Sequence, residues 1–196
     1  MTTNFSDLPQ KHFACIAADV PSHFKTFSKK GLEGRPQHYK RMSKAELMAL
    51  PVGDLAAKDC YLFYWTSAPW LKDAFEIIEA WGFKYSSVAF DWIKTNPKAP
   101  LMFTGINDWH MGQGYTTRKN AEYCLLATRG KPQRQSKEIR ALLISPRLRR
   151  SEKPPEFYSR VEKYCLGPRL DLFSRQDREN WFSFGDEAGR FNRAAE

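Results

Sequence analysis

The sequence has few of the residues that build metal sites and disulfide frameworks. Its 196 residues include four cysteines and four histidines. The cysteines (Cys15, Cys60, Cys124 and Cys165) are widely spaced inside apolar runs, and no Cys-x-x-Cys or Cys/His spacing typical of zinc occurs. The histidines form no metal-like cluster either. We therefore expect buried free thiols and no metal ion.

Long apolar runs are also missing. None approaches the roughly 20 residues of a membrane span, and residues 1–7 lack the basic and apolar regions of a signal peptide. We expect a soluble cytoplasmic protein without a membrane contact. The length suits one core, and no repeat, low-complexity tract or composition break divides it. The prediction is one domain over residues 12–187, with tails at 1–11 and 188–196.

Positive charge is abundant. Thirty-one Lys and Arg against 22 Asp and Glu give a net charge of +9 and a pI near 9.4. This balance favours a polyanionic partner, above all nucleic acid, over a merely basic soluble surface, which stays open as the alternative. The charges gather at residues 25–41, 129–140 and 147–153, mainly in expected loops. Aromatic residues interleave with the first cluster, which suits base stacking beside phosphate contacts.

Apolar strands alternate with helices along the chain. Strands are predicted at residues 12–16, 59–66, 85–94, 121–127, 141–145, 170–174 and 181–184. Helices are predicted at 43–50, where Ser43 and Glu46 form a capping box, at 70–81 and at 154–166. This alternation predicts an α/β fold, with a mostly parallel sheet covered by helices on both faces.

Asp19 directly follows the first strand and precedes the proline-stiffened turn at Pro21. In open α/β sheets, ligands bind in the crevice outside the carboxyl ends of the strands, so this carboxylate stands where a site would be. The alternative is a strand-to-loop turn in which Asp19 caps a backbone amide. The long loops at 25–41 and 97–120 also suit a functional role.

Together these segments resemble the N6-adenine methyltransferases that carry an Asp-Pro-Pro-Trp signature, typified by the catalytic subunit of the eukaryotic mRNA adenosine methyltransferase. The similarity extends from about residue 13 to 187. Its landmarks occur in family order: Ala18-Asp19-Val20-Pro21-Ser22, His38-Tyr39-Lys40-Arg41-Met42-Ser43, Leu62-Phe63-Tyr64-Trp65-Thr66, Trp92-Ile93-Lys94-Thr95-Asn96, Gly114-Tyr115, Asn120-Ala121-Glu122, Ser151-Glu152-Lys153-Pro154, Leu170-Asp171-Leu172-Phe173-Ser174-Arg175, Asn180-Trp181 and Gly185-Asp186-Glu187.

The resemblance implies a Rossmann-like sheet that binds S-adenosylmethionine (SAM). The motif order is permuted, with the catalytic signature N-terminal and the cofactor strand C-terminal. That order explains why no glycine-rich fingerprint follows the first strand. Residues 170–175 are the degenerate equivalent.

The resemblance also assigns the catalytic signature to Asp19, Val20, Pro21 and Ser22. The Asp19 carboxylate and the backbone carbonyl of residue 20 or 21 would accept the two N–H bonds of the adenine amine. They would thereby position its nitrogen for in-line attack on the sulfonium methyl. Ser22 departs from the family, which has an aromatic residue here that stacks on the target base. His23 or Phe24 would have to supply that contact instead.

Further positions match family residues around the acceptor and the cofactor. Tyr39 matches a tyrosine of the acceptor pocket, with ordinary packing as the alternative. Lys153 matches a lysine near both ligands, with a solvated basic face as the alternative. The remaining cofactor matches are Phe173, Arg175, Asp186 and Glu187, beside Asp19 and Lys153.

The function expected from this resemblance is SAM-dependent methyl transfer to the N6 amine of adenine, as in phage and bacterial relatives. DNA is expected before RNA, because no additional RNA-binding domain is visible. A duplex base would be flipped out to reach Asp19, at a cost of a few kcal/mol.

The alternative is a catalytically impaired relative that binds nucleic acid or a partner subunit, because Ser22 replaces the signature aromatic. Pairing with a second copy or with another subunit is left open.

Overall fold

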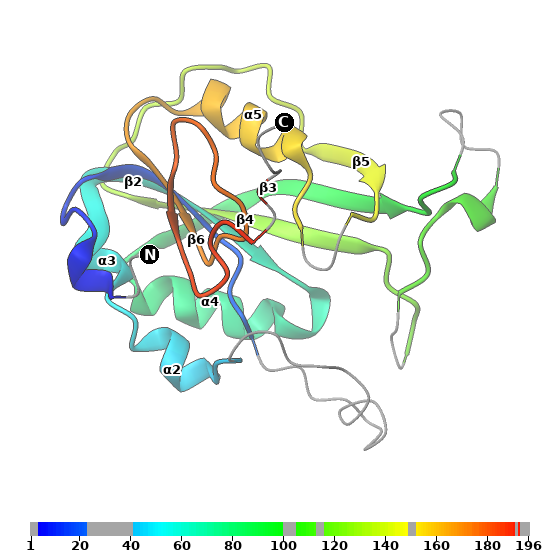
Figure 1. The fold of residues 1–196 in the computed structure, drawn as a ribbon, viewed down its shortest axis with the longest axis horizontal. Helices are drawn as coiled ribbons and strands as arrows, with labels where there is room; N and C mark the ends of the chain where they lie inside the picture. The colour runs from blue at the N-terminus through cyan, green and yellow to red at the C-terminus, as the bar shows by residue number, and fades with distance from the viewer. Residues whose placement is uncertain are drawn as a thin grey trace.

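The computed structural model describes residues 4–22, 41–99, 105–112, 116–148, 152–190 and 192, and these form a seven-stranded sheet (Figure 1). The strand order is β5-β3-β4-β2-β1-β6-β7. The strands are β1 (Phe13–Ala18), β2 (Ala56–Thr66), β3 (Lys84–Thr95), β4 (Ala121–Arg129), β5 (Leu142–Pro146), β6 (Arg169–Leu172) and β7 (Phe182–Phe184). All seven lie within a few residues of the predicted segments, so the α/β class is confirmed.

Only β4 runs against the other strands in this sheet. It pairs antiparallel with both β2 and β3, whereas β1–β2, β1–β6, β6–β7 and β3–β5 are parallel pairs. The mostly parallel sheet is therefore confirmed. The carboxyl ends of six strands consequently meet at one edge, which is the edge where such sheets bind ligands.

Strand β1 sits where the chain changes direction across the sheet. Its last residue, Ala18, lies opposite Tyr64 on β2 and Leu172 on β6. The chain moves from β1 to β2 on one side and reaches β6 and β7 on the other. This is a topological switch point, and Asp19 follows directly from it. The backbone N–H of Asp19 donates to the carbonyl of Leu172 at 3.3 Å.

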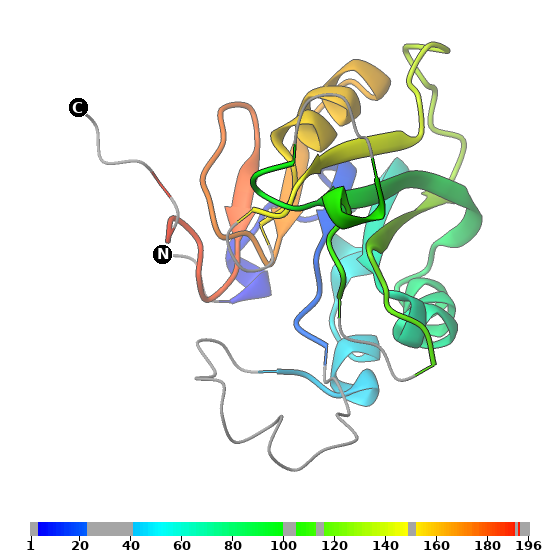
Figure 2. The same ribbon diagram turned by 90° about the vertical axis from the view of Figure 1, so that its right-hand side faces the viewer.

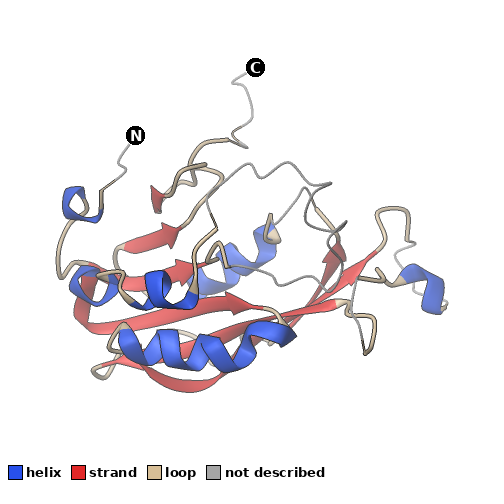
Figure 3. Ribbon diagram, turned by 90° about the horizontal axis from the view of Figure 1, so that it is seen from below, coloured by secondary structure: helices blue, strands red, loops and turns tan. Residues whose placement is uncertain are grey.

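Helices cover both faces of the sheet, because successive side chains of each strand point to opposite sides. Ile16 and Ala18 contribute to a core shared with α2 (Lys44–Met48), α3 (Val52–Leu55) and α4 (Leu71–Ala80). Cys15 and Ala17 contribute to the core beneath α5 (Pro155–Tyr164). Figures 1 and 3 show α4 and α5 on opposite sides of the sheet.

The helix ends follow local sequence signals. The Ser43 side chain accepts from the backbone of Glu46, whose carboxylate accepts from the backbone of Ser43, so the predicted capping box is present. Helix α4 stops before Gly82, whose positive φ of 80° suits a residue without a Cβ. The four-residue α3 was not predicted, because Pro51 reads as the end of α2 and the segment is too short for a periodic pattern.

Part of the expected N-terminal tail packs against the sheet. Residues 5–7 form the short 3-10 helix η1 (Phe5–Asp7), and the Phe5 ring lies 4.7 Å from the Phe184 ring. Leu8 is buried in the core beside α2 and α3. Figure 2 shows η1 and the segment that follows β7 on the same, left-hand side of the molecule. The start of the described chain and β7 therefore stabilise each other through an apolar contact.

The four cysteines are buried free thiols, as expected. Within the described residues, no group of His, Cys, Asp and Glu side chains is arranged to hold a metal ion. No helix in this part of the chain combines the length and apolarity needed to cross a bilayer.

Candidate active site at the carboxyl end of β1

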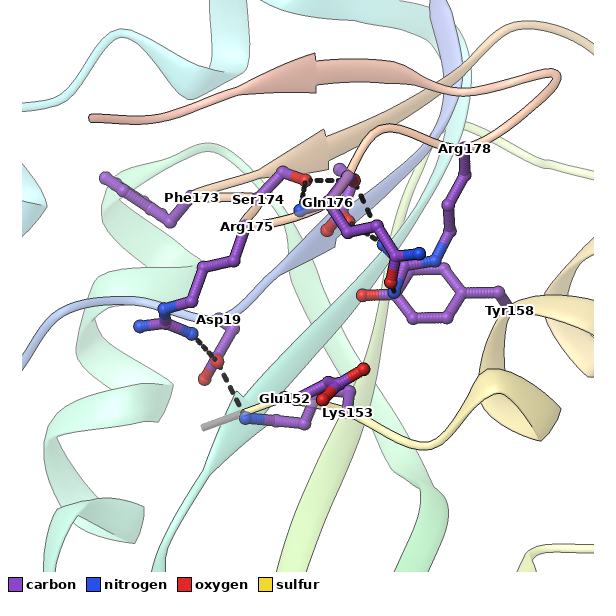
Figure 4. Close-up of a pocket in the computed structure, with 10 residues that line it drawn as sticks. Asp19, Glu152, Lys153, Tyr158, Phe173, Ser174, Arg175, Gln176 and Arg178 are labelled. Carbon is purple, nitrogen blue, oxygen red and sulfur yellow. Dashed lines mark hydrogen bonds and ion pairs between the residues drawn. The ribbon is translucent and has the colours of Figure 1, made fainter. Parts of the chain in front are cut away.

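The Asp19 carboxylate lies between two cations, as Figure 4 shows. Its Oδ2 atom is 2.7 Å from Nζ of Lys153 and 3.2 Å from a guanidinium nitrogen of Arg175. No described residue bonds its Oδ1 atom. Lys153 precedes α5 and Arg175 follows β6, so three distant parts of the sequence meet at the switch point. Asp19 therefore holds two side chains together and caps no backbone amide among the described residues.

Burial and the neighbouring charges have opposite effects on the pKa values of Asp19 and Lys153. Burial raises the pKa of Asp19, but the charges of Lys153 and Arg175 outweigh that effect, so its pKa lies below the ordinary value. Burial lowers the pKa of Lys153, but Asp19 and Glu122 outweigh it, so that pKa is raised. Both side chains are therefore charged at neutral pH. Lys153 is 5% exposed, which rules out the solvated basic face considered for it.

Two further carboxylates continue the ion-pair chain on either side. Oε2 of Glu122, on β4, is 3.4 Å from Nζ of Lys153, and its other oxygen pairs with Lys94 on β3. On the other side, Arg175 pairs with Glu187 at 3.0 Å, and Glu187 also pairs with Arg190. The resulting order of alternating charge is Lys94, Glu122, Lys153, Asp19, Arg175, Glu187 and Arg190.

A small pocket opens beside Asp19, with a volume of about 20 Å³. Its lining comes from the residue after β1, from α5 and the residues before it, and from β6 and the segment after it: Asp19, Glu152, Lys153, Tyr158, Asp171, Phe173, Ser174, Arg175, Gln176 and Arg178. Phe173 has a positive φ of 66°, which is strained for an aromatic residue. A Cβ on Gly185 would lie 2.8 Å from Cα of Phe173, so only glycine fits against this turn.

The deep wall of the pocket is a buried acid paired with a stacked arginine. The Asp171 carboxylate lies 3.2 Å from the Arg178 guanidinium. That guanidinium sits 3.6 Å from the centre of the Tyr158 ring, within cation–π distance. Burial raises the pKa of Asp171 to about 6, although Arg178 opposes the shift. Burial and the neighbouring Asp171 also raise the pKa of Tyr158.

The turn after Asp19 uses its carbonyls for internal hydrogen bonds. The carbonyl of Val20 accepts from the N–H of Ser22 at 2.8 Å, and that of Pro21 accepts from the N–H of Met42 at 2.8 Å. Ser22 thereby pairs with Met42 in an isolated bridge. Each carbonyl oxygen keeps one lone pair, so each can still accept one more hydrogen bond.

The structure brings most of the predicted site residues together. Asp19, Lys153, Phe173 and Arg175 line the pocket, and Glu187 pairs with Arg175. Asp186 is exposed and makes no contact that joins it to this network within the described residues. The predicted substrate residues His23, Phe24 and Tyr39 lie outside the described residues.

Six residues of the pocket lining were not among the predicted site residues: Glu152, Tyr158, Asp171, Ser174, Gln176 and Arg178. Asp171 carried a signal, since a carboxylate inside the apolar strand Leu170-Asp171-Leu172 is costly to bury without a partner. Its partner Arg178 lies in none of the family motifs found in the sequence. The position of Tyr158 depends on how α5 packs against the sheet, and no local sequence pattern shows that.

Comparison with known sequences identifies the family. Residues 13–187 match the profile of the MT-A70 family. The chain belongs to the MT-A70 family. The match covers nearly the whole chain and includes every element of the sheet, from β1 to β7. The resemblance inferred from the motifs is thereby confirmed, and MT-A70 is a methyltransferase family.

The relatives of this MT-A70 chain differ in how much of them it covers. The Type II methyltransferase M.MunI of a Mycoplasma species is 29% identical over 93% of the chain and 81% of the relative. A putative N(6)-adenosine-methyltransferase MT-A70-like protein of Medicago truncatula is 26% identical over 76% of the chain and 24% of the relative. The N(6)-adenosine-methyltransferase non-catalytic subunit METTL14 of Drosophila melanogaster is 29% identical over 75% of the chain and 39% of the relative.

MT-A70 methyltransferases typically use SAM, and the pocket matches its parts in chemical type. The carboxylates of Asp19 and Asp171 suit cationic groups, and the Phe173 ring suits an adenine face. The side chains of Ser174 and Gln176 can bond ribose hydroxyls.

Size is the remaining requirement for this fit. A volume of about 20 Å³ is close to that of a single water site. The pocket must therefore widen to admit SAM. The ion pairs of Arg175 with Asp19 and of Arg178 with Asp171 line the pocket at its present size.

Proposed function

We propose that this protein is a SAM-dependent methyltransferase that modifies the N6 amine of adenine in DNA, with Asp19 positioning the amine. The observation that carries the proposal is the Asp19 carboxylate, charged at neutral pH, fixed through Oδ2 and open at Oδ1 among the described residues. The position of the methylated atom is taken from the names of the Medicago and Drosophila relatives, which are N(6)-adenosine methyltransferases or their subunit.

Asp19 would act as a hydrogen-bond acceptor for one amine N–H. The lone pair of that nitrogen is delocalised into the adenine ring, so the amine is a weak nucleophile. A carboxylate that draws on the N–H bond returns electron density to the nitrogen and fixes its direction of attack. Lys153 and Arg175 support this role, because they keep the carboxylate ionised and stop its rotation.

The second amine N–H would bond to a backbone carbonyl of the turn. Val20 and Pro21 each have one lone pair left for it, since each already accepts one hydrogen bond. Their existing bonds hold the turn in place, so an incoming amine would meet an acceptor that is already oriented.

SAM, when bound, supplies an electrophilic methyl group. The residues proposed to hold it are those of the pocket: Asp19, Lys153, Phe173 and Arg175, with Glu187 fixing Arg175, and Asp186 as a further contact from the same C-terminal turn. We propose His23, Phe24, Tyr39 and Lys153 for the target base.

We propose DNA before RNA because of the share of each relative's length that this chain covers. The chain matches the Type II methyltransferase over most of both lengths, whereas it spans 24% and 39% of the two relatives named for adenosine methylation. The net charge of +9 suits either polymer.

A second candidate function is a non-catalytic, nucleic-acid-binding subunit. Ser22 favours it, because serine has no ring to stack on a flipped base, and stacking contributes about 1–3 kcal/mol per base. The similarity to the Drosophila non-catalytic subunit points the same way. Partnership with a second copy or with another subunit belongs to this candidate.

The deciding experiment is transfer of labelled methyl from SAM to single-stranded DNA, duplex DNA and RNA of mixed sequence. We expect label in N6-methyladenine with the wild type and none with Asp19→Ala. Asp54→Asn, an exposed carboxylate on α3, is the matched control and should keep full activity. Label in RNA alone would replace DNA as the substrate. The absence of both transfer and SAM binding in the folded wild type would favour the non-catalytic function.

Ser22→Trp separates the two candidates further. An enzyme that holds the base by other contacts should already be active as wild type and change by no more than about 100-fold, the rate equivalent of one stacked base. Activity that arises only in Ser22→Trp would show that the wild-type pocket lacks an essential contact. Ser22→Ala is the control, since it also lacks a ring.

A further inference from the structure

A second group of cations lies away from the pocket, on the segment that links β4 to β5. We call residues 130–141 the basic strap. It begins after Arg129, which lies opposite Cys60 on β2, and it ends before Leu142, which lies opposite Asp91 on β3. Because β4 runs against the other strands, its last residue is at the far edge of the sheet from Asp19. In Figure 1 the strap runs along the α5 side from there to β5.

Hydrogen bonds fasten the strap along its length, although it has no helix or strand of its own. The contacts near its start involve β2: the backbone N–H of Lys131 donates to Asp59 at 2.6 Å, and the Tyr61 hydroxyl donates to the carbonyl of Pro132 at 2.9 Å. Strand β2 therefore holds the start of the strap at the edge of the sheet opposite Asp19.

Helix α5 holds the rest of the strap. The N–H of Gln135 donates to the carbonyl of Tyr164 at 2.8 Å. The Arg160 guanidinium donates to the carbonyl of Arg140 and, at 2.8 Å, to that of Leu142. Ile139 packs on the core under α5. A backbone fixed in this way costs little further ordering when a ligand binds.

The strap presents four exposed cations with one acid among them. Lys131, Arg134, Lys137 and Arg140 are all exposed, and Glu138 is the single carboxylate of the segment. Through their side chains, none of the four forms an ion pair or hydrogen bond with another described residue. Four exposed cations against one carboxylate, on a backbone held in place, are suited to an extended polyanion.

We propose that the basic strap binds the phosphate backbone of the nucleic acid, in the part of the polymer that flanks the target base. This rests on the proposed function for the identity of the polymer. The strap would contact phosphates through its cations, and it has no aromatic ring that could stack on a base. It adds affinity and orientation to the contacts made at Asp19.

Strand β5 sets the distance between the strap and the pocket edge. From Arg140 the chain runs through β5 to Arg147, whose N–H donates to the carbonyl of Thr95 at the carboxyl end of β3. Seven extended residues span at most about 25 Å. At 3.4 Å per base pair that distance covers about seven base pairs of duplex. Strand β5 also lies four strand positions from β1, so this part of the strap is separated from Asp19 both along and across the sheet. We therefore expect the strap to meet the flank of a long substrate and not a short one.

The test compares two double variants that each remove two positive charges. Arg134→Gln with Lys137→Gln neutralises the strap, and Lys11→Gln with Lys72→Gln neutralises exposed lysines before β1 and on α4. Binding is measured against salt for a duplex of about 30 base pairs with the adenine at its centre, and for one of about 8 base pairs. We expect the strap variant to lower the salt slope of the long duplex by about 2, with little change for the short duplex or in the control.

Methyl transfer supplies the second readout. The strap variant should raise KM for the long duplex and leave kcat unchanged, because the chemistry occurs elsewhere. Equal slopes for the two variants would overturn the strap contact, and so would an equal loss on short and long duplexes. If the wild type methylates adenine, either of these two results would refute the strap contact alone and leave the proposed function unaffected. Strap-dependent binding only to vesicles of anionic phospholipid would assign the strap to a membrane surface and refute the proposal.

Discussion

The two groups of cations in this protein differ in what surrounds them. At the pocket, Lys153 is buried and Arg175 is half-buried. Both pair with carboxylates and belong to an unbroken chain of alternating charge. On the basic strap, Arg134 and Lys137 are exposed and lack such partners among the described residues. The same residue types therefore serve two purposes: one group fixes an acid in place, and the other offers charge to a ligand.

Burial explains the difference. A buried cation is expensive unless it is paired, so the pocket cations are structural as well as functional. An exposed cation contributes little to stability, so the strap cations are free to be used for binding. Substitutions in the two groups should separate stability from salt-dependent binding.

The largest effect is expected for Lys153→Met. This variant leaves Asp19 and Glu122 without their shared cation, and breaking a buried pair costs about 3–5 kcal/mol. We expect the free energy of unfolding in urea to fall by that amount and methyl transfer to be lost. Lys163→Met, at an exposed position of α5, is the control and should change stability by no more than about 0.5 kcal/mol. Equal losses in the two variants would contradict the account.

An intermediate effect is expected from pH at the deep wall of the pocket. The pKa of Asp171 is raised by burial to about 6, against an ordinary value near 4. The folded state then binds this proton more tightly than the unfolded state, so stability should fall as pH rises from about 4 to 6, by at most about 1.4 kcal/mol per pH unit.

Carbon-detected NMR of the Asp171 carboxyl measures this pKa directly. Arg178→Gln should raise the midpoint further, because Arg178 opposes the shift. Asp171→Asn should abolish this part of the pH dependence of unfolding. A wild-type midpoint near 4 would show that the acid is more solvated than its burial indicates.

The smallest effect on stability is expected for Lys137→Gln on the strap. With no partner to lose, it should change the free energy of unfolding by no more than about 0.5 kcal/mol. Its salt slope on long duplex DNA should still fall by about 1. A stability loss comparable to that of Lys153→Met would mean that the strap cation is paired.

Much of this architecture could be predicted from the sequence, because hydrophobic periodicity and the residues that begin or end helices and strands indicate local structure directly. The capping box at Ser43, the helix stop at Gly82 and the apolar runs of all seven strands are signals of that kind. The direction of β4 and the existence of α3 could not be predicted, since the first depends on pairing with distant strands and the second on a turn too short to show a period.

The candidate site divides in the same way. Asp19, Lys153 and Arg175 could be named from family motifs, and the structure adds that they touch. Tyr158 and Arg178 could not, because their contact joins α5 to the segment after β6 through packing alone. The hydrogen bond at the Pro21 carbonyl could not be predicted either, because its donor, Met42, is 21 residues away in the sequence.

The central claim is that an ionised Asp19 accepts the adenine amine, and the isosteric variant Asp19→Asn tests it most directly. Single-turnover methyl transfer and SAM affinity should be measured on the same preparation, with thermal unfolding as a check of folding. At saturating SAM we expect the rate of transfer to fall by about 100-fold or more, because one preorganised acceptor is lost. Any contribution of Asp19 to holding SAM should appear separately, in the SAM affinity. A folded Asp19→Asn protein that methylates adenine at the wild-type rate would contradict the account.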